Sequence, residues 1–373
     1  MIYLDYAATT PACEEALQAF YNVSKSYIGN PNSSHKLGRE AKAYLDLCTK
    51  NIADRLGVKE SEIIYTSGAT EANNLAIKGI ANSYKRYGKH IISTYLEHSS
   101  VTGPLTTLQN SGYEIDYVDI LDNGLVDLDH LKELLRDDTI LVSIGYVDSE
   151  LGIEQNIHQI GEILASYPHC FFHVDVTQAI GKIPVSLENV DLATFTPHKF
   201  YGLHGCGVLV KKDNIMIEPL IHGGVSTTPF RSGTPTLALV AALEKALSLA
   251  TSDIEERYNY VKQLNKTLKE KLQQYKNVRI NSTDKAVPHI VNISIKGANT
   301  MAFQSELEDY DIYVSTKSAC CAPNTPSRAV YAITKDRKLA LSTLRISLSH
   351  HTTEKDIETF LEYFDQCYKK LVK

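Results

Sequence analysis

The chain has no tryptophan, few methionines and no apolar run long enough to cross a membrane. Its longest apolar stretch, Thr236 to Ala250, contains Glu244 and Lys245 and is shorter than the roughly 20 apolar residues that a spanning helix requires. The first residues include Asp5 and lack the basic start and apolar core of a secretory signal. The sequence therefore predicts a soluble protein with neither a membrane partner nor an export signal.

The chain also has no excess of basic residues, because its 38 Lys and Arg are outnumbered by 44 Asp and Glu, which gives a net charge of −6. This balance disfavours a direct nucleic-acid partner, which requires a concentrated basic surface. The seven cysteines are odd in number and include no Cys-x-x-Cys pair. We therefore expect no disulfide framework and no metal site, and a location in the reducing cytoplasm.

What the chain does have is a regular alternation of β-branched apolar runs with longer amphipathic segments. This alternation is typical of βα units that build a mostly parallel sheet, so the expected fold class is α/β. Helical patterns at 71–87 and 99–111 end at Gly88 and Gly112, where we expect left-handed caps. The expected strands are 62–66, 90–93, 114–119, 140–147, 170–175, 192–196 and 206–210.

A length of 373 residues suggests two or three domains at roughly 150 residues each. After a charged amphipathic segment at 254–275, the pattern changes to short strands and helices that end in a helix at 353–371. We therefore expect a large domain over 14–252 and a small α+β domain formed by 1–13 and 253–373.

The segment from Thr66 to Glu71, Thr-Ser-Gly-Ala-Thr-Glu, lies between an expected strand and an expected helix. Free backbone N–H groups, the positive helix end and two hydroxyls meet there, which suits a phosphate group. The same residues also make an ordinary helix N-cap, so this motif alone does not decide between the two roles.

Two further strand ends carry charged side chains. Asp175 ends an apolar strand, and Lys199 follows the next strand 24 residues later. Taken singly, the aspartate suits a helix cap and the lysine suits a solvated surface charge. Together with the phosphate segment, they match the three contacts of pyridoxal phosphate, namely phosphate, ring nitrogen and an aldehyde that forms a Schiff base with lysine.

The sequence also resembles a known family over nearly its whole length. The cysteine desulfurases of the class V aminotransferase group have similar signature blocks in the same order. The blocks in this chain are YLDYAATTP, GNPNSSH, TSGATEANNLAIKG, LEHSSV, HVDVTQAIGK, HKFYGLHGCGVLV, FRSGT, STKSAC and STLRISLSHHTTEKDI. The resemblance implies the pyridoxal-phosphate-dependent transferase fold type I, which is like that of aspartate aminotransferase. It also implies a large domain that binds the cofactor and a small domain that carries a catalytic cysteine loop.

The resemblance implies a role for each matching residue. Lys199 would hold the cofactor covalently, Asp175 would pair with its ring nitrogen, and Gln178 would bind its ring hydroxyl. His98 would stack on the ring and move protons. The phosphate contacts would come from Ala69, Thr70, Thr196, His198 and, from the partner subunit of a homodimer, Thr234.

Substrate binding and chemistry are implied in the same way. Arg345 would bind the substrate carboxylate with Asn30 nearby, and Cys320 would be the nucleophile that accepts sulfur. The family usually has an asparagine where this chain has Ser149, so we expect Ser149 to reach cofactor and substrate only through water. Lys317 replaces a usual glycine and would either lower the pKa of Cys320, face an acidic acceptor or remain solvated.

The implied activity is that of a cysteine desulfurase, which converts L-cysteine to L-alanine and leaves a persulfide on Cys320. The acceptor would be an iron–sulfur scaffold or a tRNA-thiolating enzyme. We further hypothesise that Cys321 modulates release of the persulfide sulfur. The changed segment Val225–Thr228 suggests a specialised branch with its own partner. Three alternatives stay open at this point: a selenocysteine lyase, a class V aminotransferase, and a catalytically degraded interaction protein of the same fold.

Overall fold

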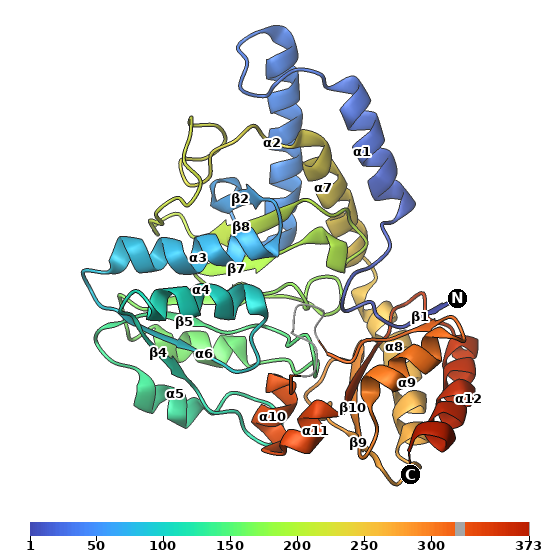
Figure 1. Ribbon diagram of the computed structural model, residues 1–373. Coiled ribbons are helices and arrows are strands. Elements are labelled where there is room, and N and C mark those ends of the chain that lie inside the picture. The colour runs from blue at the N-terminus through green and yellow to red at the C-terminus, as the bar shows by residue number, and fades with distance from the viewer. Residues whose placement is uncertain (318–324, 373) are drawn as a thin grey trace.

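The computed structural model describes residues 1–317 and 325–372 (Figure 1). Cys320 and Cys321 lie outside the described residues, so the predictions for them stay predictions. The described part is an α/β structure in which one large mixed sheet positions the site. In spatial order, the strands of this sheet are β2 (Ile63–Thr66), β8 (Gly207–Lys211), β7 (Leu192–Phe195), β6 (Phe171–Asp175), β5 (Thr139–Ser143), β3 (His90–Ser93) and β4 (Glu114–Tyr117).

All neighbouring strands of this sheet are parallel except at β8, which runs antiparallel to both β2 and β7. Each of the seven strands expected from the sequence lies in this sheet. Parallel strands need covered faces, and helices supply that cover. The helices of this part, some of which pack on other helices, as α1 does on α7, are α1 (Glu14–Ser26), α2 (Lys36–Leu56), α3 (Ala69–Tyr84), α4 (Ser99–Gln109), α5 (Leu128–Leu134), α6 (Ile157–Leu164) and α7 (Leu237–Thr251).

The C-terminal elements pack beside the start of the chain, as the orange and red ribbons near the N-terminus in Figure 1 show. Strand β1 (Ile2–Tyr3) pairs in parallel with β11 (Ile312–Tyr313). A three-stranded antiparallel sheet has the order β12 (Thr343–Ser347), β10 (Ile290–Ile295), β9 (Val278–Ile280). The helices of this part are α8 (Ile254–Leu272), α9 (Thr300–Glu308), α10 (Arg328–Thr334), α11 (Arg337–Leu341) and α12 (Glu354–Leu371).

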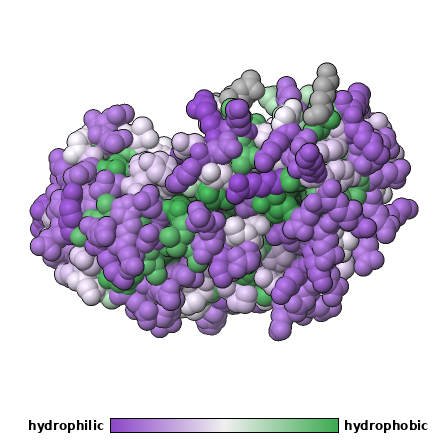
Figure 2. All heavy atoms as spheres, turned by 90° about the horizontal axis from the view of Figure 1, so that it is seen from below, coloured by the Kyte–Doolittle hydropathy of each residue, from purple (hydrophilic) through white to green (hydrophobic). Residues whose placement is uncertain are grey.

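The buried apolar side chains divide between these two sheets. One cluster joins Leu4 to side chains of α8, α9, α12 and the small sheet. The other clusters surround the large sheet and also take in Val330 and Ile333 of α10 and Leu339 of α11. The predicted domain boundaries at residues 13 and 252 stay a prediction. Hydrophilic side chains cover most of the face seen in Figure 2, with smaller apolar patches between them.

The sequence predicted left-handed helix caps at two glycines, and one of these two predictions is wrong. Gly112 has a φ of +85° after α4, as expected, but Gly88 does not have a positive φ. Helix α3 already ends at Tyr84, and Gly88 passes so close to another segment that a Cβ would lie 1.9 Å from the carbonyl oxygen of Asp138. Close backbone approach, and not a left-handed cap, therefore requires this glycine. Within the described residues, no helix is both long and apolar enough to cross a membrane.

Candidate active site

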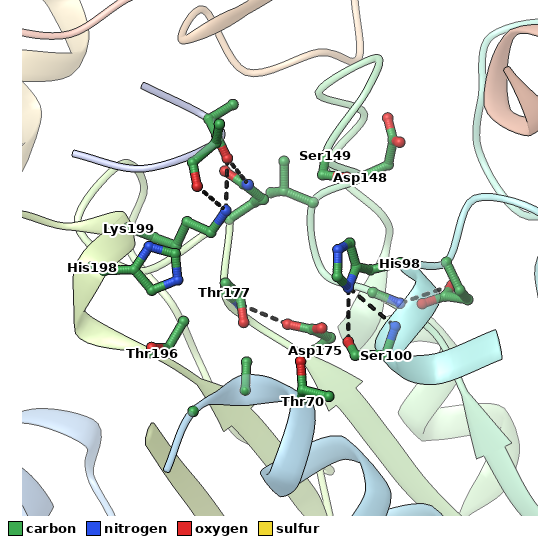
Figure 3. A pocket seen from close by; sticks show the side chains of 18 of the residues that line it. Thr70, His98, Ser100, Asp148, Ser149, Asp175, Thr177, Thr196, His198 and Lys199 are labelled. Atoms are coloured by element: carbon green, nitrogen blue, oxygen red, sulfur yellow. Dashed lines mark hydrogen bonds between the residues drawn. The ribbon is translucent and has the colours of Figure 1, made fainter. Parts of the chain in front are cut away.

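A cavity of about 370 Å³ lies at the carboxyl ends of the parallel strands, where open α/β sheets bind ligands (Figure 3). Thr94 follows β3, Gly145 follows β5, Asp175 ends β6 and Thr196 follows β7, and all four line the cavity. Arg345 of β12 lines it from the small sheet. The sheet thus gathers residues that are far apart in the sequence around one space.

The segment between β2 and α3 forms one end of this cavity, with Ala69 and Thr70 in the first turn of α3. The start of β8 fixes this turn, because a Cβ on Gly207 would lie only 2.4 Å from the carbonyl carbon of Gly68. Glu71 accepts a hydrogen bond from the backbone N–H of Ser67 at 2.7 Å. A helix N-terminus held in this way suits a phosphate group.

Glu71 is itself anchored by an ion pair of 2.8 Å with Arg231, which lies in the loop between β8 and α7. Burial pushes the pKa of the Glu71 carboxyl upward, but hydrogen bonds from Arg231 and Ser67 outweigh burial and hold the pKa below its ordinary value. The carboxylate therefore stays charged and keeps Ser67 in place.

Thr196 and His198 also line the cavity. The Thr196 hydroxyl donates to the carbonyl oxygen of Cys206 at 2.8 Å, and the Nδ1 of His198 lies 3.2 Å from the hydroxyl of Thr9. Burial, followed by the nearby charge of Lys199, lowers the pKa of His198 to about 3. His198 is therefore a neutral ring at this end of the cavity.

The Asp175 carboxylate faces the cavity from the end of β6 and is held on both oxygens. Its Oδ2 accepts from the Nδ2 of Asn73 at 2.9 Å, and its Oδ1 accepts from the backbone N–H of Thr177 at 2.9 Å. The same Asn73 Nδ2 donates to the hydroxyl of Ser100 at 2.8 Å, and Asn73 Oδ1 accepts from Thr194. This network fixes the carboxylate in the orientation expected of a partner for a ring N–H.

His98 is the N-cap of α4 and lies near Asp175 and Ser100 at the cavity (Figure 3). Its Nδ1 accepts from the backbone N–H of Ser100 at 3.2 Å, so the proton of the neutral ring lies on Nε2. Burial lowers the pKa of His98, although the charge of Asp175 acts in the opposite direction. A neutral imidazole with a proton on Nε2 is suited to stacking and to proton transfer.

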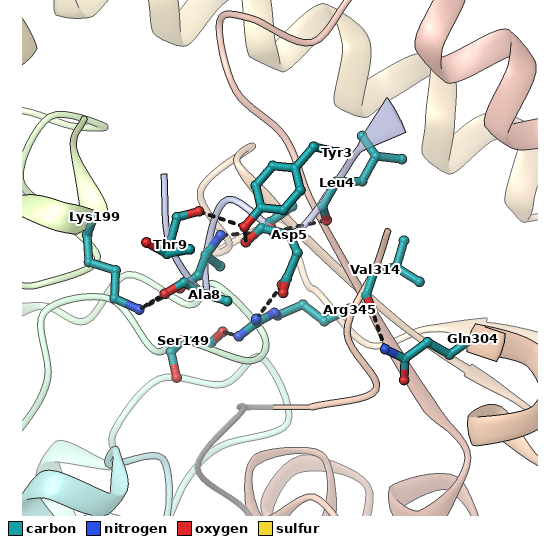
Figure 4. Close-up of polar contacts among 12 residues, drawn as sticks. Tyr3, Leu4, Asp5, Ala8, Thr9, Ser149, Lys199, Gln304, Val314 and Arg345 are labelled. Atoms are coloured by element: carbon teal, nitrogen blue, oxygen red, sulfur yellow. Dashed lines mark hydrogen bonds and ion pairs between the residues drawn. The ribbon is translucent and has the colours of Figure 1, made fainter. Parts of the chain in front are cut away.

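Lys199 ends the short 3₁₀ turn η2 (Pro197–Lys199) and extends into the cavity. Its Nζ donates to the carbonyl oxygens of Ala7 at 2.8 Å and Ala8 at 2.7 Å (Figure 4). The Nε2 of Gln178 donates to the same Ala7 oxygen at 2.9 Å. The first residues of the chain thus hold the lysine amine and the glutamine amide next to each other.

Arg345 is 1% exposed and lies between the start of the chain and the loop after β5. Its Nη2 pairs with Asp5 Oδ1 at 2.8 Å, and its Nη1 donates to the backbone oxygen of Ser149 at 2.9 Å (Figure 4). Its Nε is buried without a hydrogen-bond partner among the described residues. A buried guanidinium with a spare N–H donor is suited to a carboxylate ligand.

Several cavity residues were not predicted from the sequence. Buried Glu97 accepts at Oε1 from the hydroxyl of Thr94 at 2.8 Å and from the N–H of Gly145 at 3.1 Å. Asp148 accepts from three backbone N–H groups of its own turn and so shapes the loop that carries Ser149. Burial raises the pKa of Glu97 to about 8 and that of Asp148 to about 6. Glu97 belongs to the LEHSSV block, which was the available signal.

Two predicted residues do not line the cavity of this single chain. Asn30 is exposed and its side chain accepts from the N–H of Asn32 at 2.9 Å. Thr234 is exposed as well, and its predicted contact belongs to a partner subunit. One alternative for Lys317 was a fully solvated side chain. In the structure, its Nζ instead donates a hydrogen bond to the backbone oxygen of Thr325 at 2.9 Å. That contact joins the two described residues on either side of 318–324.

Comparison with known proteins agrees with this geometry. The chain matches the family described as "Aminotransferase class-V" over residues 2–360. It is 39% identical over 383 aligned residues to the "NifS/IcsS protein homolog" of Lactobacillus delbrueckii subsp. bulgaricus, with 100% of this chain and 98% of that protein covered. It is 37% identical to "Cysteine desulfurase IscS" of Photorhabdus laumondii, with coverages of 99% and 93%. A solved "NIFS-LIKE PROTEIN" shares the fold with a TM-score of 0.93 at 32% identity, covering 99% of this chain and 100% of that one.

The family match and the shared fold define a member of the class V aminotransferase family with the pyridoxal-phosphate fold type I. Within that class, the chain belongs to the cysteine desulfurase family, because its identity to members of that family extends over their full length. Pyridoxal phosphate is the cofactor of these enzymes, and the residues present fit it. The free helix end at α3, the fixed carboxylate of Asp175 and the amine of Lys199 meet in one cavity of sufficient size.

Proposed function

We propose that this chain converts L-cysteine to L-alanine and transfers the sulfur to Cys320 as a persulfide. The observation that carries the proposal is the convergence of Lys199, Asp175 and Arg345 on one cavity. The first two suit the cofactor, and the third suits the carboxylate of an amino acid. Bound pyridoxal phosphate supplies an electron sink that makes bonds at the substrate easier to break.

The protein side chains have separate tasks in this reaction. Arg345 binds the substrate carboxylate through its unpartnered Nε, in a position fixed by Asp5 and Ser149. The amine of Lys199 would take up and return the proton of the α-carbon, and His98, with its proton on Nε2, lines the same cavity. Asp175, held on both oxygens by Asn73 and Thr177, would pair with the ring nitrogen.

Cys320 is proposed as the sulfur acceptor. Its thiolate forms the new S–S bond while the carbon–sulfur bond of the substrate breaks, and the electron pair of that bond stays with carbon. Carbon then takes up protons and becomes L-alanine. Atoms and electrons balance without an external oxidant, because L-cysteine and a thiol give L-alanine and a persulfide.

Alanine formation from L-cysteine with a reductant, measured for the holoenzyme and its Cys320→Ala variant, tests this proposal. We expect alanine without any added keto acid, and its loss in the variant. A class V aminotransferase would require a keto acid, and a selenocysteine lyase would release alanine from selenocysteine but not from cysteine. An interaction protein without turnover would form no alanine from either substrate.

We further propose that the protein acts as a homodimer in the cytoplasm. Ile28 and Val225 are 79% and 81% exposed, and the Nδ2 of Asn32 donates to the hydroxyl of Ser226 at 2.8 Å, so the two loops that carry these exposed apolar side chains are in contact. Such a surface supports self-association. The free thiols of Cys13 and of the buried cysteines suit a reducing compartment. Sedimentation equilibrium of the parent and of Val225→Asp tests the dimer, which we expect the aspartate to weaken.

The sulfur acceptor is proposed to be an iron–sulfur scaffold or a tRNA-thiolating enzyme. The name of the Photorhabdus relative supports a role in sulfur transfer. Reaction with ³⁵S-labelled L-cysteine in the presence of each candidate acceptor distinguishes the two. Label in acid-labile sulfide on the scaffold supports the first, and label in tRNA supports the second.

A further inference from the structure

Lys182 is a buried cation that the proposed reaction does not use. It is 8% exposed, and within residues 1–317 and 325–372 it forms no ion pair with a carboxylate. Its Nζ donates to the Oε1 of Gln178 at 3.0 Å. A buried lysine without an acidic partner costs free energy of folding, so a compensating role at a nearby site is expected.

The chain between Asp175 and Lys182 places Lys182 behind a residue that lines the cavity. After β6, the backbone forms a helical turn in which the N–H of Ile180 bonds the oxygen of Val176 and that of Ile183 bonds Ala179. Residues four apart on such a turn share a face, so Lys182 lies behind Gln178. Gln178 lines the cavity, whereas Lys182 does not.

The contact with Lys182 decides which end of the Gln178 amide faces the ligand. An ammonium group only donates hydrogen bonds, so it requires the oxygen of the amide. The Nε2 group is then turned toward Ala7, with one N–H on the Ala7 oxygen at 2.9 Å. Its second N–H remains to serve a bound molecule. Without Lys182, only the Ala7 oxygen would hold the amide in this orientation.

We propose that Lys182 is a positioning residue that fixes the amide of Gln178 as a hydrogen-bond donor toward the oxygen substituent of the bound cofactor ring. This rests on the proposed contact between Gln178 and pyridoxal phosphate. Burial, together with the charges of Lys199 and Arg345, lowers the pKa of Lys182 to about 7. A bound anion opposes these effects, so binding of the cofactor favours the charged lysine that fixes the amide.

A double-mutant cycle tests whether Lys182 acts through Gln178. Apoprotein is titrated with pyridoxal phosphate, and the Kd is read from the visible absorption band. We expect Lys182→Met to raise the Kd by about 5- to 30-fold, the effect of losing one well-oriented hydrogen bond to a charged oxygen. In a Gln178→Ala background, the same substitution should change the Kd less than about 2-fold.

Lys211 provides the matched control, because it is also a buried lysine but donates to the oxygens of Lys212 and Ile215. Lys211→Met should lower the Tm of apoprotein and leave the Kd unchanged. Lys182→Met should lower the apoprotein Tm less than Lys211→Met does, because Lys182 donates to one side-chain oxygen, whereas Lys211 donates to two backbone oxygens that would lose their donor. It should also reduce the gain in Tm that the cofactor produces. Additive effects in the cycle, or an unchanged Kd, would overturn the proposal.

Gln178→Glu tests the orientation without any change at Lys182. The carboxylate would pair with Lys182 and present an acceptor to the ring oxygen, so it should bind the cofactor at least about 10-fold more weakly than Gln178→Ala. Equal or tighter binding would contradict the fixed orientation. These measurements concern cofactor binding only, so their failure leaves alanine formation by the parent, and with it the proposed function, untouched.

Discussion

Arg345 and Asp5 form a 2.8 Å ion pair that joins β12 to the start of the chain, although 340 residues separate them. The pair fixes a guanidinium that is almost fully buried, and a further N–H donor stays free. The planar guanidinium can donate to Asp5, to Ser149 and to a ligand at the same time. The ammonium group of a lysine cannot make these three contacts in the same geometry.

Arg345→Lys is therefore expected to raise the KM for L-cysteine by at least about 10-fold, since one ammonium group cannot keep the contacts with Asp5 and Ser149 and also offer a fixed N–H donor to the carboxylate. Steady-state kinetics of alanine formation measure this change. The visible band of the bound cofactor serves as the control, because Arg345 contacts the substrate and not the cofactor in the proposed site. An unchanged KM would show that the carboxylate binds elsewhere.

Asn73→Asp tests the network that holds Asp175. The substitution places a second carboxylate within hydrogen-bond distance of the first, and like charges at this distance favour protonation of one of them. A protonated Asp175 no longer stabilises a charged ring nitrogen, so we expect the Kd for pyridoxal phosphate to rise about 10-fold or more.

Asn74→Asp is the matched control on α3, because Asn74 donates to the backbone oxygen of Thr70 near the helix surface. It changes the charge of the protein equally but lies outside the Asp175 network. Similar losses of cofactor affinity in both variants would assign the effect to net charge and contradict the role of Asn73.

Much of the fold could be predicted, because the strands of a parallel sheet are continuous apolar runs that end in polar residues. All seven strands of the large sheet were expected, and Asp175 and Lys199 were expected to meet because both follow such strands. The pairing of Asp5 with Arg345 was not predicted. No local pattern indicates a contact between the two ends of a chain.

Other contacts depend on backbone atoms, which carry no sequence signal. Ser149 was expected to act through its short side chain, but its backbone oxygen is the group that binds Arg345. Lys199 likewise donates to the carbonyl oxygens of Ala7 and Ala8. Thr234 and Asn30 are exposed in the single chain, so the role predicted for Thr234 depends on a partner and the role predicted for Asn30 stays a prediction.

Gly207→Ala tests the proposed phosphate end of the cavity. A Cβ at this position would overlap the backbone of Gly68, so the first turn of α3 must move. We expect the affinity for pyridoxal phosphate to fall about 10-fold or more, whereas binding of pyridoxal, which lacks the phosphate, should change little. Gly103→Ala in α4 is the control, since a Cβ there contacts nothing within 4 Å. Equal losses for both ligands would place the phosphate elsewhere.

Glu97 provides a prediction about stability and pH. Burial first, and then the nearby carboxylates of Asp175 and Asp148, raise its pKa to about 8, against the hydrogen bonds from Gly145 and Thr94. The unfolded chain releases this proton near pH 4.3, so between that pH and about 8 only the folded state keeps it. The contribution of Glu97 to the free energy of unfolding therefore falls as the pH rises through this window.

Glu97→Gln removes this dependence, because the amide is neutral at every pH and keeps an oxygen for Thr94 and Gly145. The variant should gain stability relative to the parent as the pH rises from 5 to 8, by on the order of a few kcal/mol. Urea unfolding of the apoproteins at several pH values measures the gain. Glu358→Gln on the exposed face of α12 is the control, and its free energy of unfolding should change with pH as that of the parent does. If the free energy of unfolding of Glu97→Gln also changes with pH as that of the parent does, Glu97 is ionised in the folded protein. The cavity then holds one more negative charge than its hydrogen bonds indicate.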